Sequence, residues 1–351
     1  MRLAAWDIPK LNANYSYGQL NSFKKDDEFT ISQSFAFPLA YIRSHQLAGT
    51  MVENAESKEK VVKGNLAGMI KSAYYEYTFL LSKKRLMIYE DSIYANFKSA
   101  AQLRFQQGET SLLEKITAET QSLVVKNQIS QVESDIHIIV CRLQTLLNEP
   151  SKIRITDTVL ERIQLELLSD SMVFLDNPNF LILEQEKKIS MLQRKIESSK
   201  LYPDFTLGYF NQSNKELSFN GRFDGFQAGV AIPLIFSGQK GKIESARLNE
   251  KITEAKFTTE ANSLHHQYHI LSEELQKFKQ SLNFFESSAL NQSDLILNQA
   301  NKSYRAGEID YMEYIQNLRS GLGIRHEFLE TLNQYNQAAI AIEILTNHIT
   351  Y

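Results

Sequence analysis

The stretch Phe105-Gln106-Gln107-Gly108-Glu109 recurs 199 positions later as Tyr304-Arg305-Ala306-Gly307-Glu308. We refer to these two stretches as the turn segments. Each is followed at the same spacing by a glutamate and an isoleucine: Glu114 and Ile116, then Glu313 and Ile315. Upstream, Phe37-Pro38-Leu39 matches Ile232-Pro233-Leu234. A repeat of about two hundred residues is too long for a solenoid, so the sequence indicates a duplicated half.

Each half opens with two runs in which apolar and polar residues alternate, at residues 11–18 and 29–37 and again at 205–209 and 226–232. Alternation with a period of two is typical of a strand with one apolar face. Polar loops at residues 24–27 and 214–225 separate the runs. Two antiparallel β-hairpins are therefore predicted.

Long helices are predicted after each hairpin, at about residues 42–103 and 241–303. The chain has only 14 Gly and 6 Pro in 351 residues, and no proline lies between Pro38 and Pro150 or after Pro233. Apolar residues at alternating intervals of three and four indicate coiled-coil packing. They are Tyr268, Leu271, Leu275, Phe278, Leu282, Phe285 and Ala289, with returning sets at Ile129, Val132, Ile136, Ile139, Leu143 and Leu146 and at Leu318, Leu322, Leu329, Leu332, Ala339 and Ile342. Gly108 and Gly307 are placed where the helices reverse and a positive φ is needed, whereas Gly64 and Gly68 are expected to weaken the first helix.

These patterns divide the chain into six segments. We expect a first β-hairpin at 1–40, a helical hairpin at 41–148 with its tip near 105–109, and an irregular or short-helical connector, the equatorial region, at 149–178. A helix at 179–200, a second β-hairpin at 201–236 and a second helical hairpin at 237–351 with its tip near 304–308 follow. Residues 237–242 contain glycine and lysine but lack the P-loop spacing, and are interpreted as a turn.

The composition excludes several classes of function. The 38 basic and 41 acidic residues give a net charge of -3, which argues against a nucleic-acid partner. One cysteine, Cys141, excludes an intramolecular disulfide framework and a cysteine metal cluster. No arrangement of nucleophile, base and acid and no dinucleotide fingerprint is present, so we expect neither an enzyme nor a cofactor.

Four strands of about ten residues cannot close a barrel, because the smallest transmembrane barrels need eight strands. An open sheet would leave two unpaired edges and an apolar face. Three copies around an axis would supply twelve strands to one barrel and long helices to a tube. The alternative is a soluble α+β protein whose own helices cover the sheet.

The order of hairpin, long helix, glycine turn and long helix, repeated once, resembles the TolC family of outer-membrane efflux channels. Specific similarities are residues 201–205 entering the third strand, 229–234 leaving the fourth, and Tyr304-Arg305-Ala306-Gly307 followed by residues 311–315. Residues 333–338 resemble the branch found beside heavy-metal pumps of the resistance-nodulation-division class. The likeness covers Pro9 to about His348.

This resemblance implies a mainly α protein with membrane β structure: a homotrimeric α/β-barrel with four strands per chain, in the outer membrane with its helices in the periplasm. It would passively conduct exported substrate, with heavy-metal cations suggested, from a periplasmic adaptor (membrane fusion protein) and an inner-membrane pump. The adaptor-docking positions carry over to Phe105, Gly108, Glu109, Tyr304, Gly307 and Glu308. The alternative function is a soluble periplasmic coiled-coil scaffold or adaptor.

Two further sets of residues are candidate sites. Asp310 and Glu313 lie three apart on one helix and would form acidic rings at a pore constriction under threefold symmetry; the family often has a second acid where this chain has Gln316. The competing interpretation is a solvated helix surface. His265 and His269 have the four-residue spacing that can chelate a transition metal, against an exposed helix face as the simpler interpretation.

The beginning of the chain departs from the family pattern. The family has a helix before its first hairpin, whereas only Met1 to Ile8 precede it here, without a secretion signal. We interpret the chain as N-terminally truncated, or as the end of a longer or fused protein.

Overall fold

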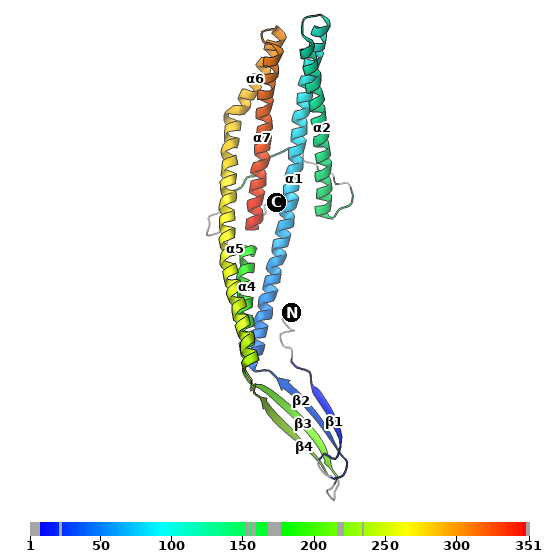
Figure 1. Cartoon of the computed structure of the whole chain (residues 1–351), viewed down its shortest axis with the longest axis vertical. Helices are drawn as coiled ribbons and strands as arrows, with labels where there is room; N and C mark the ends of the chain where they lie inside the picture. The colour runs from blue at the N-terminus through cyan, green and yellow to red at the C-terminus, as the bar shows by residue number, and fades with distance from the viewer. Residues whose placement is uncertain are drawn as a thin grey trace. The chain divides into compact units, whose positions relative to one another are not determined.

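The computed structural model describes residues 8–20, 23–151, 153, 155, 159–167, 177–215, 221–233 and 235–348 (Figure 1). The expectation for residues 1–7 and the match at Leu234 therefore lie outside the described residues. The elements are β1 (Asn12–Gly18), β2 (Asp26–Phe35), α1 (Pro38–Gln106), α2 (Leu112–Leu147), α4 (Pro178–Ser199), β3 (Asp204–Asn214), β4 (Gly221–Ala231), α5 (Ser237–Phe284), the π-helical turn η2 (Phe285–Ala289), α6 (Leu290–Ala306) and α7 (Tyr311–Thr346).

The chain forms two compact units. One comprises Met1–Lys60 and Asp176–Ser263, and the other comprises Val61–Leu175 and Leu264–Tyr351. Each unit therefore draws on both halves of the duplicated sequence. None of the described helices has a stretch long and apolar enough to cross a lipid bilayer.

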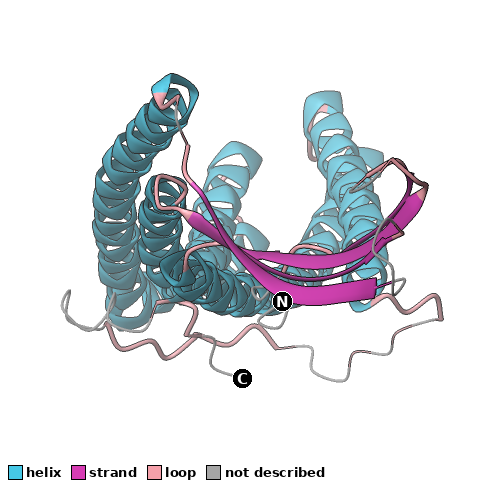
Figure 2. Ribbon diagram, turned by 90° about the horizontal axis from the view of Figure 1, so that it is seen from below, coloured by secondary structure: helices cyan, strands magenta, loops and turns pink. Residues whose placement is uncertain are grey.

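The first unit contains one antiparallel sheet (Figure 2), whose strands follow the order β1-β2-β3-β4 (Figure 1). Its register places Tyr15 opposite Phe29, Ile31 opposite Tyr209, and Tyr209 opposite Phe226, so these side chains share one face. The other face is mainly polar, apart from Phe210, Phe223 and Ala231. The predicted alternation is thus confirmed.

The apolar face of this sheet is open. Phe226 is 87% exposed, Tyr15 is 63% exposed and Leu207 is 57% exposed. An α+β protein that covers the sheet with its own helices would bury these side chains, so that alternative is wrong. Both predicted loops are too long, because β2 already begins at Asp26, inside 24–27, and β4 already begins at Gly221, inside 214–225.

Coiled-coil positions form the interior of the second unit. Val132, Ile139 and Leu143 of α2 and Leu332, Ala339 and Ile342 of α7 are buried with Tyr268, Leu275 and Leu282 of α5 in one cluster. A second cluster surrounds Phe97, Leu297 and Leu318. The three-four spacing read from the sequence therefore marks buried positions.

The helix predicted at 241–303 contains a π turn. Phe285, Ala289, Ser293 and Leu297 are all buried, which gives three successive intervals of four residues. In an uninterrupted α-helix each such interval rotates the buried side by about 40°. The wider turn η2 takes up this excess, so that Ser293 can donate a 2.7 Å hydrogen bond to the carbonyl of Gly321 in α7.

The duplication is visible in the helix ends. Helices α2 and α7 each have 36 residues, and both their first and their last residues lie 199 positions apart. Ser111 and Asp310 cap the N-termini, whereas Asn148 and Asn347 end the helices with φ of 50° and 53°. Matching caps at matching positions show that both halves use the same local signals.

The segment at 237–242 is helical, so its interpretation as a turn is wrong. The amide of Lys240 already donates to the carbonyl of Phe236 at 2.8 Å.

Gly64 and Gly68 allow α1 and the end of α7 to approach closely. A Cβ atom on Gly68 would lie 2.2 Å from Cγ1 of Ile344, and one on Gly64 would lie 1.9 Å from Oδ1 of Asn347. These glycines lower the helix propensity of α1, and the close packing that they allow offsets this cost.

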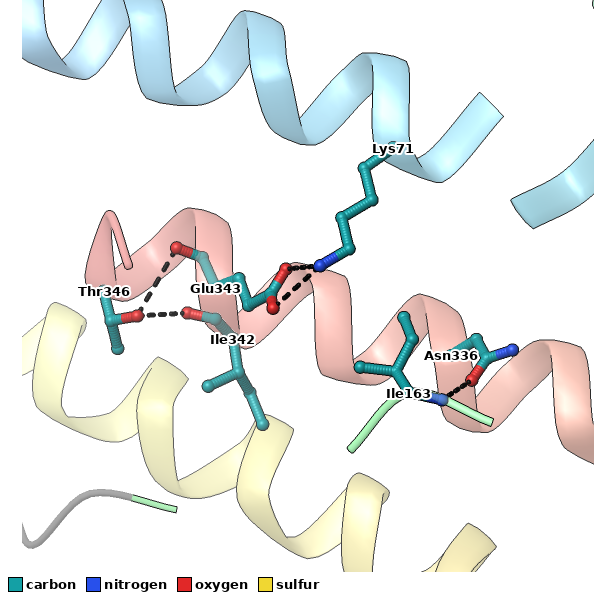
Figure 3. Close-up of polar contacts among 6 residues, drawn as sticks. All are labelled: Lys71, Ile163, Asn336, Ile342, Glu343 and Thr346. Carbon is teal, nitrogen blue, oxygen red and sulfur yellow. Dashed lines mark hydrogen bonds and ion pairs between the residues drawn. The ribbon is translucent and has the colours of Figure 1, made fainter. Parts of the chain in front are cut away.

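Polar contacts hold α1, α7 and the connector together next to these glycines (Figure 3). The ammonium of Lys71 donates to both carboxylate oxygens of Glu343, at 2.7 and 2.9 Å, and Glu343 is almost fully buried. Asn336 accepts from the amide of Ile163 at 2.9 Å and donates to the carbonyl of Glu161 at 2.8 Å. The connector, which is irregular at residues 159–167, thus obtains partners for two of its backbone groups from α7.

We predict that Gly68→Ala lowers the midpoint of thermal unfolding, because overpacking costs about 1–3 kcal/mol. The matched control is Gly49→Ala in the same helix, where an added Cβ would meet nothing within 4 Å. That change should stabilise the helix by up to about 1 kcal/mol. Circular dichroism melting of the purified protein measures both, and equal effects of the two substitutions would contradict the packing role of Gly68.

Candidate functional site

Both turn segments adopt the same backbone structure at the end of a helix. Gly108 has φ of 78° and Gly307 has φ of 74°, which confirms the need for positive φ. Glu109 donates its amide to the carbonyl of Arg104 at 2.8 Å, and Glu308 donates to that of Ser303 at 2.9 Å. These bonds close a Schellman motif in each hairpin. The conformation of the tips is therefore fixed by local sequence.

A buried carboxylate joins the two tips. Glu114 in α2 is 4% exposed, and one of its oxygens accepts a 2.7 Å hydrogen bond from the hydroxyl of Tyr304 in α6. Arg104 of α1 lies 3.7 Å from the same oxygen, and the hydroxyl of Thr110 donates to the other one. We refer to Arg104, Thr110, Glu114 and Tyr304 as the tip cluster.

Aromatic rings pack against the tip cluster. Tyr304 and Tyr314 are stacked with ring centroids 4.3 Å apart, and the edge of Phe97 contacts both rings. Burial, with the Glu114 carboxylate beside it, raises the pKa of the Tyr304 hydroxyl above its ordinary value. Burial also raises the pKa of Tyr314 to about 12. Tyr304 is therefore protonated at neutral pH and remains a donor to Glu114.

The two halves have diverged at this site. Phe105 occupies the position equivalent to Tyr304 but carries no hydroxyl group. Glu313, the equivalent of Glu114, is exposed. The sequence analysis identified Tyr304 as a tip residue but did not predict its contact with Glu114. The sequence feature that pointed to Glu114 was the glutamate repeated six residues after each glycine.

The remaining predicted tip residues lie at the surface or nearly so. Glu109, Glu308 and both glycines are exposed, and Phe105 is half-buried with the ammonium of Lys115 5.3 Å from its ring centre. The Glu308 carboxylate accepts a 2.8 Å hydrogen bond from Ser303. A groove of about 870 Å³ runs beside them between α1 and α6, lined by Asn96, Arg104, Glu109, Asn301, Lys302 and Arg305 among others.

Asp310 and Glu313 are placed together at the start of α7. Both are exposed, and the Asp310 carboxylate accepts a 2.9 Å hydrogen bond from the amide of Glu313. Asp310 is thus the N-cap of the helix, a role in which a carboxylate is favourable. In the single chain, the carboxylate oxygens of these two residues that do not accept this hydrogen bond lie at the surface.

His265 and His269 converge on one side of α5. Their Nε2 atoms are 3.3 Å apart, and their ring centroids are 4.4 Å apart. His265 is half-buried and His269 is exposed. Within the described part of the chain, no three His, Cys, Asp or Glu residues gather as a possible metal cluster.

We predict that Tyr304→Phe loosens the contact between the two tips, because it removes only the hydroxyl and leaves the carboxylate of Glu114 short of a donor. The expected loss of stability is about 1–3 kcal/mol. Faster amide hydrogen exchange in residues 100–116 and 300–315 would measure it. Tyr311→Phe, in the same tip, is the matched control; if it had the same effect, the role of the Tyr304 hydroxyl would be refuted.

Comparisons with known proteins identify the fold. No protein-family model matches the sequence, and no curated protein matches it. The chain is similar to the crystal structure of CusC (TM-score 0.83, 15% identity, 98% of this chain and 85% of that one) and to the outer-membrane protein VceC of Vibrio cholerae (0.82, 15%, 98% and 88%). It is also similar to the outer-membrane channel OprN (0.85, 12%, 98% and 82%). With its four-stranded sheet and two long helical hairpins, the chain has the TolC fold of outer-membrane efflux channels.

Proposed function

We propose that this protein is the outer-membrane channel of a tripartite efflux pump and conducts exported substrate passively. The observation that carries this proposal is the open sheet, whose apolar face is exposed in the single chain. The similarity to the channels CusC, VceC and OprN supports the same role.

The edges of the sheet favour a trimer. β1 and β4 each pair on one side only, and four strands are too few to enclose a lumen. Three chains would supply twelve strands and pair every edge with its neighbour. The face with Tyr15, Leu207 and Phe226 would then contact lipid, and the face with Asn14, Thr30 and Gln227 would line water.

In this assembly the tips would dock a periplasmic adaptor that connects the channel to an inner-membrane pump of the resistance-nodulation-division class. Exposed Gly108, Glu109, Gly307 and Glu308, with half-buried Phe105, are available for that contact. Tyr304 is 7% exposed, so we assign it to holding the two hairpins together through Glu114. The connector at 149–178 would be the equatorial region of the trimer.

Asp310 and Glu313 would form acidic rings at the constriction. Three copies of an exposed acidic pair around one axis attract cations and repel anions. The N-cap role of Asp310 supports this placement, because it fixes that carboxylate at the start of α7.

The heavy-metal cargo remains a prediction that rests on resemblance at residues 333–338. In this chain Asn336 is fully buried and binds the connector, Tyr335 and Ala338 are buried, and Asn333 donates to Glu76 at 2.9 Å. Because these contacts explain the motif by packing, the motif itself does not distinguish metal cations from organic compounds as cargo.

We predict that the purified protein conducts ions in planar lipid bilayers, and that Asp310→Asn with Glu313→Gln reduces its preference for cations. Both changes remove charge, and asparagine remains an effective N-cap. Reversal potentials in a salt gradient measure the selectivity. Glu260→Gln with Glu273→Gln, which removes two exposed acids of α5, is the charge-matched control. Selectivity that stays the same in the Asp310→Asn, Glu313→Gln variant would refute the acidic ring.

We predict that Phe226→Arg prevents assembly in the outer membrane, whereas Gln227→Arg is tolerated. The two residues are neighbours on opposite faces of β4. An arginine facing lipid near mid-membrane costs about 2–4 kcal/mol per chain, and one facing water costs far less. Membrane fractionation and native electrophoresis measure the trimer; equal assembly of both variants, or a monodisperse protein in detergent-free buffer, would contradict the channel.

A further inference from the structure

The histidine pair on α5 has the nitrogen separation of a two-ligand metal site. Zinc binds imidazole nitrogen at about 2.0–2.1 Å, so two ligands at a tetrahedral angle lie about 3.3–3.4 Å apart. The Nε2 atoms of His265 and His269 are 3.3 Å apart. The side chains therefore already hold the separation that a shared tetrahedral ion requires.

The helix itself fixes this arrangement. Residues four apart on an α-helix lie one above the other on the same face, so both imidazoles extend from successive turns of α5. Tyr268 is buried about 80° around the same helix from the pair, and its ring lies beside that of His269, with 6.2 Å between the centroids. His265 is half-buried and His269 is exposed, so the pair lies at the border between the packed and the accessible sides of α5. A bound ion would have protein on one side and water on the other.

We propose that His265 and His269 form a two-histidine site for a divalent transition metal, with zinc as the best match. Neutral imidazole is a ligand for zinc, copper and nickel, and not for magnesium or calcium, which prefer oxygen. Two protein ligands leave the other tetrahedral positions to water or to an anion. The site is independent of the channel proposal and requires no trimer.

A hydrogen bond between the two rings would give the same spacing without any metal, and substitution separates the two interpretations. In His269→Gln the side chain can still form a hydrogen bond with His265, but the second imidazole ligand is lost. The control is His266→Gln, because position 266 lies about 100° around the helix from position 265.

The experiment is calorimetric titration of the full-length, detergent-solubilised protein with Zn²⁺, repeated with Mg²⁺. We expect the wild type and His266→Gln to bind one more Zn²⁺ per chain than either His265→Gln or His269→Gln, and none of the four proteins to bind Mg²⁺ in this way. Circular dichroism without metal establishes that the variants are folded, which the exposed position of His269 leads us to expect.

Equal zinc stoichiometry in the wild type and His269→Gln would overturn the proposal and favour the simple hydrogen bond. Loss of the same site in His266→Gln would overturn it as well, because coordination would then not follow the four-residue spacing. Conductance is not part of the readout, so neither result bears on the channel function.

Discussion

The open sheet, with unpaired edges and an exposed apolar face, is the constraint on which the rest of the molecule depends. A single chain has four strands, two edges with unpaired backbone groups, and a face on which Phe226 is 87% exposed. In water such a surface favours aggregation. Lipid contact on the apolar face and strand pairing with neighbouring chains at both edges would remove the free-energy cost of this exposure. The alternation of apolar and polar residues along the strands suits that environment.

The helices show how a duplicated sequence can keep its local structure while its contacts diverge. Both halves end a helix at glycine with positive φ, begin the next with a side-chain cap, and finish it at an asparagine. The glutamate that follows each turn has nevertheless acquired different surroundings. Glu114 is buried under Tyr304 and Arg104, whereas Glu313 is exposed. One copy joins the two hairpins, and the other remains free to act at a surface.

Buried polar groups in the second unit mainly determine how its helices and the connector are positioned against one another. Glu343 and Asn336 are fully buried, and they form specific hydrogen bonds with half-buried Lys71 and with the connector, segments far apart in the sequence. Such contacts add little net stability compared with apolar packing, but breaking one leaves an uncompensated group. Together with the close approach at Gly64 and Gly68, they define one register between α1, α7 and the connector.

The sequence by itself determined the elements of this protein and their order. Strand alternation, coiled-coil spacing and the glycines at the reversals are local signals, and each is visible within about ten residues. The structure also corrected local interpretations: residues 221–225 of the predicted polar loop lie in β4, and residues 237–242, interpreted as a turn, lie in α5. Only the tertiary structure decided that Gly64 and Gly68 are packing sites, that a π turn realigns α6, and that Glu114 meets Tyr304 across 190 residues. These features depend on which segment, distant in the sequence, packs beside each residue in the fold. A local sequence pattern does not specify that neighbour.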